Sequence, residues 1–186
     1  PWDERTHAGP GAWDPSRTIQ TLQRYRRNLS FPAFTGGSLD SDPGNGAVTS
    51  GDAVGTVNGH YDWDPAVMDR VDQWGVKLTL RNLWTWTGPR LAPATATFTV
   101  TPRRLQQFVV EPGHTYTWDV KRLSDGVVVQ SGETTADALG LLSVPGVLVH
   151  RDGSWLRVRS EASVGVEPVT GPAGALDVRL DRAPDA

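Results

Sequence analysis

The chain has 186 residues and a formal net charge of −3, which matches one domain or one domain with an appendage. A chain of this length buries enough surface to fold without covalent cross-links. It contains no cysteine, which excludes disulfides and thiolate metal sites. The acidic balance argues against nucleic acid as a partner, and no apolar run is long enough to cross a membrane, so we expect neither partner.

The basic residues are unevenly divided, because Lys77 and Lys121 are the only lysines and all other cationic side chains are arginine. Together with 20 glycines and 14 prolines, this is typical of a high-GC bacterial genome. The first residues show neither a basic n-region nor an apolar h-region, so we expect any export signal to lie upstream or to have been removed.

The N-terminal segment carries the signals of one short helix. Asp14 suits the N-cap, and Pro15 suits the first helical position. Apolar residues then recur at every third position, at Ile19, Leu22 and Tyr25. The sequence therefore predicts a helix over residues 15–27, followed by an extended run over residues 31–34. We expect residues 1–34 to form a separate N-terminal loop and helix.

A long polar segment, residues 35–52, follows as an acidic loop or linker. Loops of this length are usually functional or flexible. The segment supplies oxygen ligands between glycines, which suits Ca²⁺ and makes calcium the one cofactor that the sequence suggests. The candidate ligands are Asp40, Asp42, Asn45 and Asp52. Their spacing departs from that of an EF-hand, and the alternative is a solvated loop of Asx turns.

From residue 53 onward the pattern changes to an alternation of apolar and polar residues, which predicts β-strands. The clearest alternation is at Val76, Leu78 and Leu80. Further strands are predicted at residues 53–59, 95–101, 105–110, 114–123, 127–133, 141–149, 154–159 and 176–180.

Turn signals separate these strands. Asp-Gly pairs at residues 125–126 and 152–153 predict hairpins, and residues 111–113 predict a further turn. Short strands at such intervals predict a mainly β fold. We expect an antiparallel β-sandwich of immunoglobulin or fibronectin III-like type over residues 53–182, preceded by the short α-helix and the acidic loop.

The chain is rich in tryptophan, and tryptophans exposed on a β-sandwich can stack on sugar rings. Trp84 and Trp86 lie in a polar stretch and are the candidate ligand-binding residues, provided that one strand carries both. The alternative for this pair is an interdomain contact. Trp74, Trp118 and Trp155 stand in apolar alternation, so we expect them in the core.

The remaining titratable residues show no spacing that defines a site. His60, His114 and His150 are far apart and lack the close pairing typical of zinc ligands. Asp62 and Asp64 form an i, i+2 pair of carboxylates, but nothing distinguishes this pair from a solvated strand edge.

The segments WDERTHAGPGAW, YRRNLSFPAFTGGSLDSDPGNG and DAVGTVNGHYDWD resemble the C-terminal region of bacterial secreted α/β-hydrolase-like (esterase-like) proteins. In that group the last hydrolase histidine and helix lead into an appended β-domain. The resemblance implies a secreted, extracellular bacterial protein and makes His7 the candidate general base. This chain departs from the group because it contains no G-x-S-x-G nucleophile motif, so any enzyme here is at most an esterase-like fragment.

Three functions follow from these features. In the first, the chain is the C-terminal accessory portion of an ester-hydrolase-like protein that acts on a polymeric or carbohydrate ester, with an upstream hydrolase domain as its partner. In the second, it is a stand-alone β-sandwich module that binds a polysaccharide or polyester. In the third, it is a structural extracellular domain stabilised by calcium.

Overall fold

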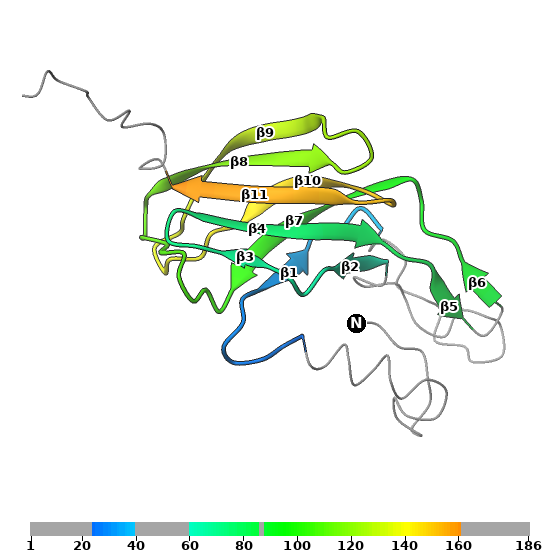
Figure 1. The fold of residues 1–186 in the computed structure, drawn as a ribbon, viewed down its shortest axis with the longest axis horizontal. Helices are drawn as coiled ribbons and strands as arrows, with labels where there is room; N and C mark the ends of the chain where they lie inside the picture. Colours follow the sequence, from blue (N-terminus) through cyan, green and yellow to red (C-terminus); the bar gives the residue numbers. More distant parts are fainter. Residues whose placement is uncertain (1–23, 40–59, 86–87, 161–186) are drawn as a thin grey trace, which may run out of the picture.

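The computed structural model describes residues 24–39, 60–85 and 88–160, and these residues form a mainly β, antiparallel structure (Figure 1). The strands are β1 (Phe31–Thr35), β2 (Tyr61–Trp63), β3 (Met68–Asp69), β4 (Gln73–Leu80), β5 (Leu83–Thr85), β6 (Gly88–Arg90), β7 (Thr95–Arg103), β8 (Thr115–Arg122), β9 (Val128–Thr135), β10 (Val144–His150) and β11 (Ser154–Ser160). No described segment is a helix that is long and apolar enough to span a membrane.

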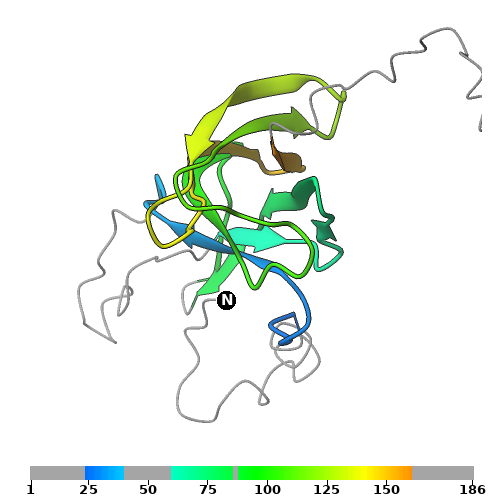
Figure 2. The same cartoon turned by 90° about the vertical axis from the view of Figure 1, so that its left-hand side faces the viewer.

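The strands form two main sheets. One has three strands in the order β1-β7-β10, and the other has six, in the order β2-β4-β11-β8-β9 with β3 also paired to β4. β5 and β6 form a separate pair. Figure 2 looks down the strands and separates the layer with β8, β9 and β11 from the layer with β1. The predicted mainly β, antiparallel fold is therefore confirmed for the described residues.

The core lies between the two main sheets and follows from the alternation in the sequence. On β4, Trp74, Val76 and Leu78 are fully buried, while the residues between them face the other way. A fully buried apolar side chain contributes roughly 1.5–3 kcal/mol relative to an exposed one. The three-stranded sheet supplies Phe98 and Val100 to the same cluster. Alternating burial of this kind fixes the register of each strand, because a slip of one residue would expose the whole apolar set.

The connection from β7 to β8 is a loop held by one carboxylate. Asp69 accepts hydrogen bonds from the backbone N–H groups of Gln106, Gln107 and Phe108 at 2.7, 3.1 and 2.8 Å. The prediction of a strand over residues 105–110 is therefore wrong. Those N–H groups bond to a side chain instead of a neighbouring strand, and Phe108 is buried by the loop. Arg104, which starts the loop, has a φ of 52°.

The two Asp-Gly turns have different outcomes. The turn at residues 124–126 joins the paired strands β8 and β9, with Gly126 at a φ of 74°, so this hairpin prediction is confirmed. The turn at residues 151–153 is no hairpin, because β10 belongs to the three-stranded sheet and β11 to the six-stranded one. An Asp-Gly pair predicts that the chain reverses direction. It does not predict that the two strands on either side of the turn pair with each other, because each of them can belong to a different sheet.

The N-terminal segment packs against the β-structure. Residues 24–27, the end of the predicted helix, form a turn instead, and residues 15–23 lie outside the described residues. The Tyr25 ring stacks edge-on against Phe31 and Trp63, at 5.0 and 5.3 Å between centroids, and these contacts replace a last helical turn. β1 pairs with β7, so the three-stranded sheet begins before the predicted domain boundary at residue 34.

Candidate functional site

Most of the predicted site residues lie outside the described part of the chain. These are the candidate base His7, the candidate calcium ligands Asp40, Asp42, Asn45 and Asp52, and Trp86. Trp84 lies on β5, which ends at Thr85, and its side chain is not among those described. Their predicted roles stay predictions.

The tryptophans predicted for the core divide into two groups. Trp74 and Trp118 are buried, as predicted, with 0% and 9% of their surface exposed. Trp155 is only half-buried, and it alternates with the buried Leu156 on β11, so it lies on the outer face of the six-stranded sheet. The prediction of a core position for Trp155 is therefore wrong. On β11 the buried apolar position is that of Leu156. Because successive side chains of a strand point to opposite faces, Trp155 faces away from the core.

A glycine makes room for the Trp155 indole. Gly75 on the adjacent strand β4 stands opposite Arg157, two register positions from the Trp155–Lys77 pair and on the same face of the sheet. A Cβ atom at Gly75 would lie 2.9 Å from Trp155 Cζ2 and 2.9 Å from Met68 Cε. The edge of the ring therefore lies directly over the backbone of β4, next to the Met68 side chain. Trp155 is thus a fixed aromatic surface on the sheet.

Two lysines flank this surface in the same cross-strand row. Trp155 pairs with Lys77 on β4 and with Lys121 on β8. They are the only two lysines of the chain, although they are separated by more than forty positions in sequence. Within the described residues, neither lysine forms a salt bridge. In backbone register the row continues to Asp64, whose N–H donates to the Lys77 carbonyl at 3.0 Å, and the end of the Lys121 side chain lies beside Gly126 in the β8–β9 turn.

The next rows of this outer face hold a compact charge cluster. Asp119 on β8 is 6% exposed and accepts hydrogen bonds at Oδ1 from two arginines of β11. Arg157 donates from Nε at 3.2 Å and from a terminal nitrogen at 2.9 Å, and Arg159 donates from a terminal nitrogen at 2.9 Å. One carboxylate therefore holds two guanidinium groups, and the cluster keeps a net positive charge. We call the outer side chains Lys77, Trp155, Lys121, Arg157, Arg159 and Asp119 the Trp155 face.

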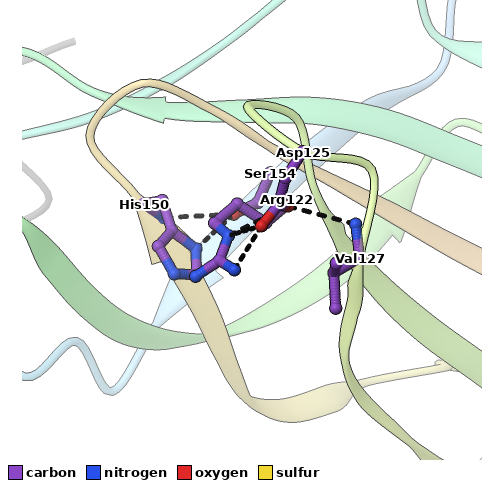
Figure 3. A network of polar contacts seen from close by, with 5 residues as sticks. All are labelled: Arg122, Asp125, Val127, His150 and Ser154. Atoms are coloured by element: carbon purple, nitrogen blue, oxygen red, sulfur yellow. Dashed lines mark hydrogen bonds and ion pairs between the residues drawn. The ribbon is translucent and has the colours of Figure 1, made fainter.

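A second polar region lies where the β8–β9 hairpin meets the crossing from β10 to β11 (Figure 3). It is an open basin of about 530 Å³, lined in part by Arg122, Asp125 and His150. Arg122 and Asp125 form a bidentate ion pair, and the Val127 N–H donates to Asp125 at 3.1 Å. The hydrogen bond from Arg122 lowers the pKa of Asp125 to about 2. The same pairing raises the pKa of Arg122.

The basin contains a serine and a histidine in contact, but the contact is structural. Nδ1 of His150 lies 3.2 Å from Ser154 Oγ, and the His150 backbone N–H donates to the same oxygen at 3.0 Å. Ser154 has 0% of its surface exposed, so no substrate carbonyl reaches its Oγ. A serine nucleophile must instead stand open to the substrate. The pair therefore anchors the turn that connects the two sheets.

The other titratable groups considered in the sequence are engaged in local structure. Asp62 pairs with Arg24 at 2.5 Å, and Asp64 accepts from the Ala66 N–H at 2.9 Å, so the two carboxylates do not act as a pair. His60 is buried, with Nδ1 2.9 Å from the Arg81 carbonyl. The described residues contain no group of three or more metal-ligating side chains.

Comparison with known proteins adds no relative: no family model, no curated protein and no solved structure matches this chain.

Proposed function

We propose that this chain is a non-catalytic β-sandwich module that binds a polymer, with carbohydrate as the polymer class. The observation that carries the proposal is Trp155, an aromatic ring held against Gly75 on the outer face of the six-stranded sheet. Indole rings combine a large apolar face with a low entropic cost of immobilisation, which suits them to bind rigid ligands.

The chemistry of the described residues supports binding rather than catalysis. The Ser154–His150 contact is inaccessible to a substrate, and the carboxylates Asp62, Asp119 and Asp125 are each engaged by an arginine. The Trp155 ring, half-exposed on the outer face of the six-stranded sheet, offers an apolar contact to a ligand. Binding is thus the role that these side chains serve best.

We further infer that the two main sheets form an immunoglobulin or fibronectin III-like sandwich. In that class one sheet holds strands A, B and E, and the other holds G, F, C and C′. β1, β7 and β10 match A, B and E in order, and β11, β8 and β9 match F, C and C′. The neighbour of β11 at the G position is β4, which precedes β7 in the chain. The match therefore departs from that class at the G position, where β4 stands and is followed by β2 and β3.

The relation to esterase-like proteins is part of the same proposal. A binding module appended to a hydrolase would hold the polymer near an upstream catalytic domain, which agrees with the resemblance of the first segments. The proposal does not require His7, since binding uses residues of the six-stranded sheet. The candidate calcium loop and the Trp84–Trp86 pair remain separate proposals, tested by chelation and by substitution of each tryptophan.

The proposal is tested by co-sedimentation of the full chain with insoluble polysaccharides and polyesters. We expect retention on at least one polysaccharide, and we expect Trp155→Leu to reduce that retention at least tenfold. Leucine preserves apolar contact with Gly75 and Met68 but lacks the flat ring. Leu139→Ala serves as the matched control, because Leu139 is 85% exposed in the loop between β9 and β10 and belongs to neither main sheet. Retention that is equal for the wild type and Trp155→Leu would reject the proposal.

A further inference from the structure

We infer that β9 is a cover over the free edge of β10, held closed by the side chains of Gln130 and Thr134, and that it keeps this edge from pairing with a strand of a second copy of the chain. The observation behind the inference is that both side chains form hydrogen bonds with backbone groups of β10. It goes beyond the proposed function and does not depend on polymer binding.

The edge that is covered is suited to pair with another strand. β10 is the last strand of the three-stranded sheet and pairs with β7 on one side only. Its sequence is apolar over Val147–Val149, and no Asp, Glu, Lys or Arg lies between Asp137 and Arg151. An apolar edge strand without charged residues is a site where a strand of another chain adds to a sheet. An uncovered β10 is therefore expected to pair with a second copy.

The inward side of β9 is polar, whereas the inward side of its neighbour β8 is apolar. Gln130 pairs with Val120, and Thr134 pairs with Tyr116, and both of these β8 residues are buried in the core. Directly paired residues of antiparallel strands point to the same face, so Gln130 and Thr134 also point toward the other sheet. They meet the edge of β10 there, which explains why polar side chains occupy inward positions.

The contacts match the backbone groups of that edge. Oε1 of Gln130 accepts from the Leu148 N–H at 2.7 Å, and Nε2 of Gln130 donates to the Gly146 carbonyl at 3.1 Å. One side-chain amide thus bonds to a donor and an acceptor of β10, as the backbone of a neighbouring strand would. Oγ1 of Thr134 donates to the Ser143 carbonyl at 2.6 Å. Loss of these contacts leaves the three backbone groups without their partners.

The cover is itself an edge strand, and this allows it to open. β9 lies at the end of the six-stranded sheet and pairs with β8 alone (Figure 1). No residue of β9 is fully buried, and Val128 is 54% exposed. Segments with few buried apolar contacts open at a lower free energy than the core. The links from Gln130 and Thr134 therefore favour the closed state over the open one.

Hydrogen exchange of the full chain, followed by NMR, tests whether β9 opens. Gln130→Met keeps the length of the side chain and removes its amide. We expect the Leu148 N–H and the β9 amides that bond to β8 to exchange about tenfold faster in this variant, because two hydrogen bonds of the closed state are lost. The amide of Val76 in the core should not change. Gln107→Met is the matched control, since Gln107 is exposed and only its backbone N–H forms a hydrogen bond.

Sedimentation equilibrium tests whether the opened edge pairs. We expect Gln130→Met to self-associate with a Kd about tenfold below that of the wild type, and Gln107→Met to match the wild type. Adding Leu148→Pro to Gln130→Met should restore the behaviour of the wild type. The Leu148 N–H bonds to Gln130 and not to β7, so proline there removes a group of the free edge and leaves the β7–β10 pairing in place.

Each outcome bears on one step of the inference. Unchanged exchange at Leu148 and in β9 of Gln130→Met would overturn the cover. Faster exchange without stronger self-association would overturn its role against pairing. Equal self-association with and without Leu148→Pro would overturn β10 as the pairing edge. A melting curve shows that each variant is folded, and Thr134→Val, which keeps the shape of the side chain and removes one link, is the second variant for the same measurements.

Discussion

Substitution of Asp119 should lower the stability of the fold, because this carboxylate holds two arginine side chains of β11. Asp119 is 6% exposed, and its Oδ1 accepts all the contacts from Arg157 and Arg159. Removing one partner of a fully buried ion pair costs about 3–5 kcal/mol. The two arginine side chains are 37% and 35% exposed, so water screens part of this cost. We therefore expect Asp119→Ala to lower the free energy of unfolding by about 2–3 kcal/mol, and Asp119→Asn by about 1 kcal/mol because the amide oxygen still accepts.

The assay is urea denaturation followed by circular dichroism. The control is Glu133→Gln, which removes one negative charge from the same face at an exposed position with no salt bridge among the described residues. We expect this control to change stability by less than about 0.5 kcal/mol. An Asp119→Ala protein as stable as the wild type would refute the role given to the carboxylate.

Three further predictions concern the fold. Gly132→Val should destabilise the protein by about 1–3 kcal/mol in urea denaturation, because a Cβ there would lie 3.0 Å from Trp118 Cζ2 and force the buried indole to move; a neutral result would mean that the ring has space. Asp69→Ala should cost about 2–3 kcal/mol by the same assay, since three backbone N–H groups lose their acceptor, and an unchanged midpoint would contradict the anchoring of the β7–β8 loop. Asp125 has a folded-state pKa of about 2, below its ordinary 3.8, so its pairing with Arg122 stabilises the fold above pH 3.8 and is lost as the pH falls toward 2; Asp125→Asn should flatten that part of a stability–pH curve, and an unaltered curve would contradict the pairing.

The sequence predicted the strands whose alternation is strong and uninterrupted. β4, β7, β8, β9, β10 and β11 all begin and end within a few residues of the predicted ranges. Apart from β9, whose Val128 is 54% exposed, these strands direct their apolar residues into one core. The alternation within a single strand is enough to predict that it is a strand. The pairing of β4 with β11, which are about eighty positions apart, is not a property of either strand alone. It depends on how the other strands assemble, because their arrangement determines which strand edges are left to pair.

The errors have one shared cause, since each depends on a contact between distant residues. Residues 105–110 are apolar enough for a strand, but their N–H groups bond to Asp69. Residues 24–27 continue a helical period, but Tyr25 packs on Trp63 across a long sequence gap.

The candidate site was missed for a related reason. Trp155 stands next to Leu156, and a large apolar residue beside a core residue was assigned to the core. The strict alternation of a strand assigns Leu156 and Trp155 to opposite faces, and that rule was sufficient to place Trp155 outside. The flanking lysines were visible as the only two in the chain, but their position beside Trp155 follows from the registers of three strands. No pattern within one segment contains that information.

The most direct test of ligand binding on the Trp155 face is a heteronuclear NMR titration of the indole N–H signals. The chain has eight tryptophans, and the Trp155→Leu variant identifies the signal of Trp155 by its absence. We predict that a soluble fragment of a polysaccharide that retains the chain shifts the Trp155 indole signal and leaves those of the buried Trp74 and Trp118 in place. An unchanged Trp155 signal at a ligand concentration that shifts the signals of other tryptophans would contradict the assignment of the binding face.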